Sequence, residues 1–145
     1  TVYALDASTG KWLWHYRRRT TPAATLRGAS APLVDENEVL CGLSDGFLVA
    51  ISLQDGSLKW ERKLHFGPKF TDVDAHPVLE NGVVYVPSYD GALYALKRKG
   101  GEVLWRYDAG GSRTVALDGQ VGIIADDQAV DPALLSQQQI NSLLI

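Results

Sequence analysis

The residue types that usually carry chemistry form no recognisable catalytic site in this 145-residue sequence. His15, His65 and His76 lie at irregular separations, and none has a second ligand at a spacing typical of metal binding. Asp126-Asp127 is the carboxylate pair with the most interesting position, but the chain has an internal repeat, and this pair falls at a turn position of that repeat. We therefore interpret this pair as turn residues.

Nucleophilic chemistry has equally weak support. The sequence pairs no histidine with Ser30 or Ser44. Cys41 is the single cysteine and lies in an apolar run, where a thiol is usually a small core residue. The glycines are explained by β-turns, which leaves no phosphate-binding loop. We predict a protein that is not an enzyme and has no catalytic residue, no metal site and no cofactor.

Composition favours a turn-rich β protein. The chain has 46% hydrophobic and 21% charged residues, fourteen glycines, four tryptophans and no methionine. A net charge of −3 argues against a nucleic-acid partner. The basic run Arg17-Arg18-Arg19 is interpreted as a solvated strand end. No signal peptide is visible, and we expect any native leader and lipid anchor to lie outside this chain.

An internal repeat organises the sequence. Three segments align, and each ends on a tryptophan that follows a glycine by four positions: Tyr3–Trp14, Val49–Trp60 and Tyr94–Trp105. The tryptophans are 46 and 45 residues apart. Other landmarks keep the 45-residue offset, namely Pro32 and Pro77, Asp45-Gly46 and Asp90-Gly91, and Ala50 and Ala95.

Each unit of about 45 residues contains four strand signals. In the clearest unit, Ala75–Leu79, Val83–Val86, Ala92–Leu96 and Val103–Tyr107 are rich in β-branched, aromatic and other apolar residues. Short turns rich in glycine and polar residues join the last three of them. Four short antiparallel strands in sequence are typical of one blade of a β-propeller.

The predicted fold is therefore all-β, a β-propeller fragment of about three four-stranded antiparallel blades over residues 1–130. It comprises two complete blades and two half blades. Strands at Thr114–Asp118 and Val121–Ala125 begin the last half blade, and Gly119 follows Gly82 by 37 residues. Residues 131–145 are predicted to form a short C-terminal helix, since Asp131 suits its cap. This tail either covers an open propeller edge or docks on another protein.

The two half blades suggest self-association. The chain begins with the last two strands of one blade and ends with the first two of another. Blades need neighbours on both sides, and rings usually have roughly 4–8 blades. We expect a homo-oligomer in which one copy completes the blade of another, so that a dimer forms a six-bladed ring.

A resemblance to known families rests on the pattern A-x-D-x-x-T-G-x-x-x-W at Ala4–Trp14. It is similar to the tryptophan-docking repeat of quinoprotein-type propellers, which include pyrroloquinoline-quinone dehydrogenases and the outer-membrane barrel-assembly lipoproteins known as BamB. Three segments resemble the second family: Leu26–Pro32, Asp72–Pro77 and Asn81–Tyr85. The resemblance covers roughly residues 1–127, about half of that family's eight-bladed ring.

The resemblance implies a scaffold that binds proteins, in the periplasm and associated with the outer membrane. In that family the first two segments dock the central outer-membrane barrel-assembly protein through its periplasmic domain. Carried over, the docking contacts are Leu26, Arg27, Asp72 and Asp74. An alternative that is compatible with docking is that Arg27 pairs with one of the aspartates and fixes adjacent loops. Unfolded outer-membrane proteins are a further implied partner, bound by strand addition at open sheet edges.

Two other functions stay open at this point. One is a fragment of a pyrroloquinoline-quinone-type dehydrogenase, which would need a calcium site and a catalytic aspartate on the propeller axis. The other is an unrelated propeller that serves as a binding module.

Overall fold

A computed structural model of the chain describes residues 1–18, 30–64, 73, 76–88, 92–108, 114–119 and 121–123. Every regular element in these ranges is a β-strand. The strands are β1 Val2–Leu5, β2 Trp12–Tyr16, β3 Leu33–Asp35, β4 Glu38–Gly42, β5 Phe47–Ser52, β6 Leu58–Lys63, β7 Val78–Glu80, β8 Val83–Ser88, β9 Ala92–Lys97, β10 Val103–Tyr107, β11 Ala116–Asp118 and β12 Val121–Ile123. A search of the same residues finds no helix with the length and apolar character of a membrane span.

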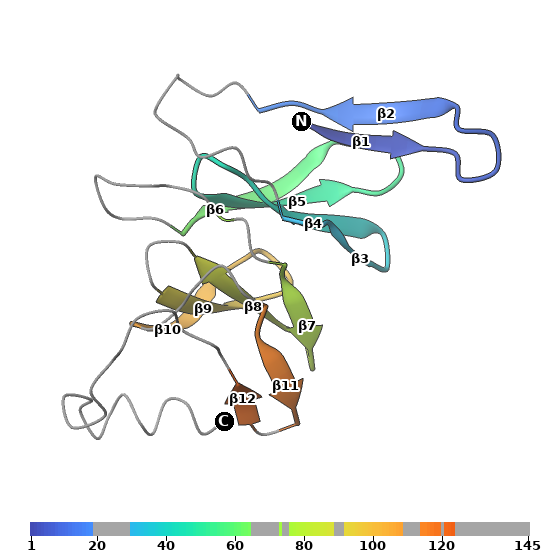
Figure 1. Cartoon of the computed structure of the whole chain (residues 1–145). Coiled ribbons are helices and arrows are strands. Elements are labelled where there is room, and N and C mark those ends of the chain that lie inside the picture. The colour runs from blue at the N-terminus through green and yellow to red at the C-terminus, as the bar shows by residue number, and fades with distance from the viewer. Residues whose placement is uncertain are drawn as a thin grey trace, which may run out of the picture.

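The strands form four antiparallel sheets that follow one another along the chain. Two sheets have four strands, in the orders β3-β4-β5-β6 and β7-β8-β9-β10, and the hairpins β1-β2 and β11-β12 flank them. Figure 1 shows the sheets stacked in chain order, from β1-β2 at one end to β11-β12 at the other. This arrangement confirms the predicted all-β propeller fragment with two complete and two half blades. The predicted boundary at residue 130 and the tail 131–145 lie outside the described residues.

The central strands are buried on both faces because a sheet covers each side. In β8, Val84 and Val86 pack towards the preceding sheet, while Tyr85 packs on the opposite side. All three are less than 9% exposed. Successive side chains of a strand point to opposite faces, so a strand between two sheets reads as a continuous apolar run. Three apolar clusters result, one in each gap between neighbouring sheets.

The turn of the last hairpin corrects one detail of the sequence alignment. In the β7–β8 hairpin, Asn81 takes the first of two turn positions with φ 50°. In the β11–β12 hairpin, Asp118 pairs with Val121, so Gly119 takes that first position with φ 57°. Gly119 therefore corresponds to Asn81 and not to Gly82, because both fill the first left-handed position of a two-residue turn.

The repeated tryptophans join one sheet to the next. Trp14 of β2 lies against Gly56, where an added Cβ would come within 2.7 Å of the indole, and its Nε1 donates to the carbonyl oxygen of Leu53 at 2.9 Å. Trp60 of β6 lies against Gly101 in the same way. Each of these tryptophans thus packs against the turn glycine of the next sheet in the stack.

Candidate protein-docking face

The four predicted docking residues lie outside the described residues: Leu26, Arg27, Asp72 and Asp74. Two residues that belong to the same sequence segments are described. Ser30 follows the first pair by three positions, and Val73 separates the two aspartates. Their contacts show where each of the two predicted docking segments is attached to the propeller.

Ser30 is fixed to the end of strand β4. It is 3% exposed, and its backbone N–H donates to the carbonyl oxygen of Gly42 at 3.3 Å. The backbone N–H of Gly42 in turn donates to Oγ of Ser30 at 2.7 Å. The hydroxyl of Ser30 thus accepts a backbone hydrogen bond and helps to fix this residue to β4.

Val73 is attached next to Ser30, at the start of the turn that follows β4. It is fully buried, and its backbone N–H donates to the carbonyl oxygen of Leu43 at 3.2 Å. A Cβ at Gly42 would overlap the carbonyl oxygen of Val73 and press on Oγ of Ser30. Glycine is required at position 42 because two segments, 43 residues apart in sequence, reach the backbone of β4 at one point.

Ser30, Gly42 and Val73 thus form a junction, and Cys41 lies beside it as a core residue, as predicted. It is 2% exposed and its Sγ contacts Ser30. Burial raises the pKa of the Cys41 thiol, and the hydrogen bond with Ser30 opposes that shift only in part. Since the thiolate is the nucleophile, burial makes this thiol unreactive.

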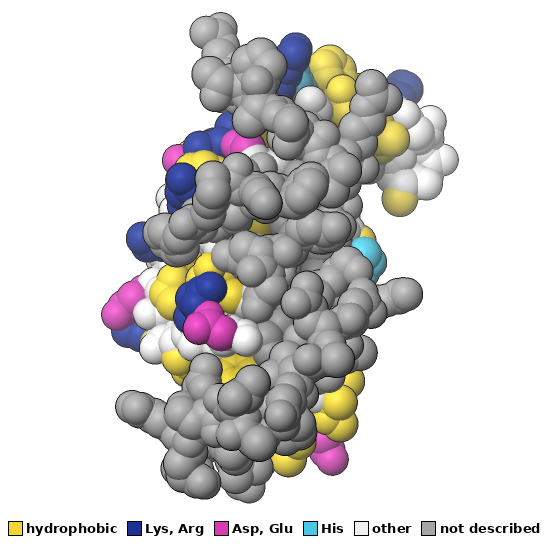
Figure 2. Space-filling view, turned by 60° about the vertical axis from the view of Figure 1, so that its left-hand side comes forward, with side chains coloured by type: hydrophobic (Ala, Val, Ile, Leu, Met, Phe, Trp, Pro, Cys, Tyr) yellow, Lys and Arg dark blue, Asp and Glu magenta, His cyan; other side chains and the backbone are white. Residues whose placement is uncertain are grey.

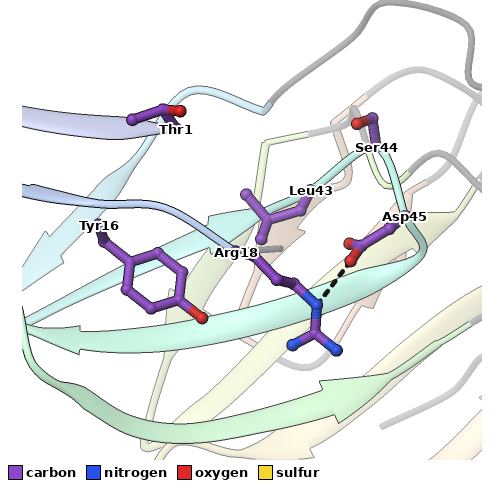
Figure 3. Close-up of a pocket in the computed structure, with 6 residues that line it drawn as sticks. All are labelled: Thr1, Tyr16, Arg18, Leu43, Ser44 and Asp45. Carbon is purple, nitrogen blue, oxygen red and sulfur yellow. Dashed lines mark ion pairs between the residues drawn. The ribbon is translucent and has the colours of Figure 1, made fainter. Parts of the chain in front are cut away.

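A small hollow of about 90 Å³ opens on the same turn, between the first two sheets. Figure 3 shows its lining, formed by Thr1, Tyr16, Arg18, Leu43, Ser44 and Asp45. Nε of Arg18 pairs with Oδ2 of Asp45 at 2.6 Å. The guanidinium also pairs with Glu61 and lies over the ring of Phe47, 3.7 Å from its centroid.

These partners stabilise the positive charge of Arg18. Desolvation opposes the charged form, but the hydrogen bond to Glu61 and the charge of Asp45 outweigh it, so the pKa of Arg18 is raised. Desolvation likewise raises the pKa of the neighbouring Tyr16 phenol, against the effect of Arg18. The hollow is therefore a polar, ion-paired junction between two sheets.

The interpretation of the basic run as solvated is wrong for Arg18. Its side chain is 21% exposed and ion-paired, whereas Arg17 is exposed as predicted and Arg19 lies outside the described residues. The repeat held a signal for this, because position 18 corresponds to Leu64, which is fully buried. A basic residue at a position that faces the next sheet indicates an inter-sheet ion pair.

The histidines have structural contacts where the structure describes them. Nδ1 of His76 accepts from the backbone N–H of Ala31 at 3.4 Å, which links equivalent positions of the two complete blades. His15 stacks on Trp12 with ring centroids 5.0 Å apart. Within the described ranges no group of three or more His, Cys, Asp or Glu side chains is arranged to hold a metal ion. His65 and Asp126-Asp127 fall outside those ranges.

A comparison with protein families matches residues 1–138 to the family described as outer membrane protein assembly factor BamB. The chain belongs to this family. Among curated BamB proteins, the one from Legionella pneumophila is 35% identical over 61% of this chain, and the one from Alkalilimnicola ehrlichii is 36% identical over 74%. The chain spans 24% and 30% of the lengths of these two relatives.

Solved structures support the fold. The crystal structure of BamB from Moraxella catarrhalis covers 83% of this chain with a TM-score of 0.72 at 23% identity, and the match spans 38% of that chain. A quinohemoprotein alcohol dehydrogenase from Comamonas testosteroni covers 72% with a TM-score of 0.62 at 22% identity, over 18% of its own length. At these identities both neighbours establish the propeller architecture alone, and the family assignment rests on the match to residues 1–138.

Proposed function

We propose that this chain is a non-enzymatic docking scaffold in outer-membrane protein assembly. Its main partner would be the central outer-membrane barrel-assembly protein, bound through that protein's periplasmic domain. The chain would act in the periplasm at the outer membrane. Membership of the BamB family supports a role in outer-membrane protein assembly. The contacts of Ser30 and Val73 at the end of β4 support a docking surface that both segments share.

The observation that carries the proposal is the shared attachment of the two docking segments. Ser30 and Val73 both bind the backbone at the end of β4 and the turn that follows, through Gly42 and Leu43. Segments that are attached at one point are presented to a partner together. We propose that this attachment lowers the conformational entropy that the two segments would lose on binding, which would favour affinity.

The chemistry of the four residues suits a protein partner. Leu26 offers an apolar anchor, and Arg27 offers a planar set of donors for a carboxylate. In an extended segment, alternate side chains point to one side. We accordingly propose that Asp72 and Asp74 act together, on the side opposite the buried Val73, towards cations or backbone amides of the partner.

The proposal includes two further partners. Unfolded outer-membrane proteins would bind by strand addition at an open sheet edge. The second further partner would be another copy of this chain. Neither of these requires the four docking residues.

Titration calorimetry with the purified periplasmic domain of the barrel-assembly protein tests the main proposal. We expect Arg27→Ala and Asp74→Ala each to weaken binding by roughly tenfold or more, as for a charged residue at an interface centre. Matched controls are Arg17→Ala and Asp118→Ala, which remove exposed charges elsewhere and should leave the affinity unchanged. Equal weakening by the control variants, or no binding by the parent chain, would overturn the docking assignment.

A further inference from the structure

Residues 65–72, which end at the first aspartate of the second proposed docking segment, are flanked by two residues that bind one corner of the fold. This β4–β5 corner comprises the end of β4 and the turn to β5, residues 42–46. Leu64, directly before the stretch, donates its backbone N–H to the carbonyl oxygen of Gly46 at 2.8 Å. Val73, directly after it, donates to the same corner at 3.2 Å. Both flanking residues are fully buried, so the chain is fixed at the β4–β5 corner immediately before and after the stretch.

Residues 19–29, which carry Arg27, are flanked in the same way. Ser30, directly after them, is bound to the β4–β5 corner by the two hydrogen bonds described above. Arg18, directly before them, reaches the same corner with its side chain, because its Nε pairs with Oδ2 of Asp45 at 2.6 Å. Four flanking residues thus meet at one corner, and Arg18 is attached to it by an ion pair.

The contacts of Arg18 restrict the direction of its side chain. The guanidinium pairs with Asp45 through Nε and with Glu61 of β6 through a second nitrogen, and it lies over the ring of Phe47. The side chains of Arg18 and Asp45 are 21% and 16% exposed, so salt screens this pair less than a pair at the open surface. A planar guanidinium that three groups hold has a narrow range of orientations.

The repeat indicates that a blade does not need this ion pair. The residue that corresponds to Arg18 in the next unit is Leu64, which is apolar and binds the corner through a backbone hydrogen bond. Arginine at position 18 instead provides a charged side-chain link from the β1–β2 sheet to the corner of the following sheet. The link therefore calls for an explanation beyond the architecture of the propeller.

We propose that Arg18 and Asp45 are positioning residues for docking. Their ion pair sets where the stretch with Arg27 starts, relative to the corner that also holds Val73, and so aligns the two proposed docking segments. Neither residue needs to touch the partner, because the effect on binding passes through Arg27. This inference rests on the proposed function and assigns part of its affinity to residues outside the docking motifs.

A double-mutant cycle tests the inference by titration calorimetry with the purified periplasmic domain of the barrel-assembly protein. Arg18→Met removes the charge and keeps most of the apolar stem. We expect this variant to weaken binding by roughly fivefold. The effect of Arg27→Ala should be at least about threefold smaller in the Arg18→Met background than in the parent chain. The reason is that a misplaced stretch has already lost much of what Arg27 contributes.

The matched control is Arg98→Met. Arg98 also joins two sheets by ion pairs, but its partners Asp35 and Glu36 lie before β4, at the end of that strand opposite the β4–β5 corner. Both methionine variants remove one positive charge from a molecule whose face in Figure 2 carries cationic and anionic side chains interspersed. We expect both to lower the urea midpoint of unfolding, whereas Arg98→Met should leave the affinity and the effect of Arg27→Ala unchanged.

A conservative variant separates positioning from general stability. Arg18→Lys keeps the charge but not the fork that reaches Asp45 and Glu61 together, so we expect it to recover part of the affinity lost in Arg18→Met. The inference would be overturned by parent-like binding of Arg18→Met, by independent effects of Arg18→Met and Arg27→Ala, by equal weakening in Arg98→Met, or by no recovery in Arg18→Lys. A parent chain that fails to bind, or that is insensitive to Arg27→Ala, would instead overturn the docking proposal and the positioning role with it.

Discussion

At the scale of single residues, Gly42 has the most exacting environment in the described part of the chain. It accepts a hydrogen bond from Ser30 and donates one back, and the carbonyl of Val73 occupies the space of a side chain. This requirement comes from close approach of backbones and not from turn geometry. A side chain at position 42 would therefore disturb both Ser30 and Val73, the described residues of the two proposed docking segments.

We predict that Gly42→Ala lowers the free energy of unfolding by about 1–3 kcal/mol, the usual cost of overpacking a rigid site. The matched control is Gly122→Ala, where an added Cβ would meet Leu117 at an ordinary 3.6 Å. Urea unfolding followed by tryptophan fluorescence measures both. A Gly42→Ala protein as stable as the Gly122→Ala protein would contradict the close approach at position 42.

At the scale of elements, the tryptophans link one sheet to the next by two different means. Nε1 of Trp14 donates to the carbonyl of Leu53, whereas Nε1 of Trp60 is buried with no hydrogen-bond partner in the described structure. Both indoles lie against a glycine of the following sheet. Apolar contact is thus common to both links, and the hydrogen bond belongs to the first alone.

We predict that Trp14→Phe costs more stability than Trp60→Phe, by about 1 kcal/mol, which is the net value of a typical hydrogen bond. The loss of ring area is the same in both variants, and the second also removes an unsatisfied buried donor. Urea unfolding of the two variants gives the difference in their free energies of unfolding, calculated from the urea midpoints with the same m value for both. Equal costs, or a greater cost for Trp60→Phe, would refute this account of the links.

At the scale of the whole molecule, the sequence predicts the stack of sheets because each blade repeats the same landmarks. Tryptophan, glycine and turn residues recur at 45 or 46 positions, so strand order and sheet count follow from spacing. The sequence alignment is off by one residue at Gly119 because the offset there is shorter than 45 residues, so the longer repeat does not fix the register of the turn. The sequence does not predict the partners of Arg18 because they come from the β4–β5 turn and from strand β6 of the neighbouring blade.

The candidate docking face was predictable only in part. The motifs around Arg27 and Asp72 indicate which residues contact a partner, because they resemble a family with that function. Their common attachment at Gly42 has no sequence signal, since it depends on a backbone contact between residues distant in the chain.

We propose that the two segments attached at the junction of Ser30, Gly42 and Val73 form a single docking surface. Hydrogen exchange measured with and without the periplasmic domain of the barrel-assembly protein tests it directly. We predict that peptides covering residues 26–30 and 72–74 both become protected from exchange, while the β1–β2 hairpin is unchanged. Protection of one segment alone, or protection confined to other parts of the chain, would contradict the claim.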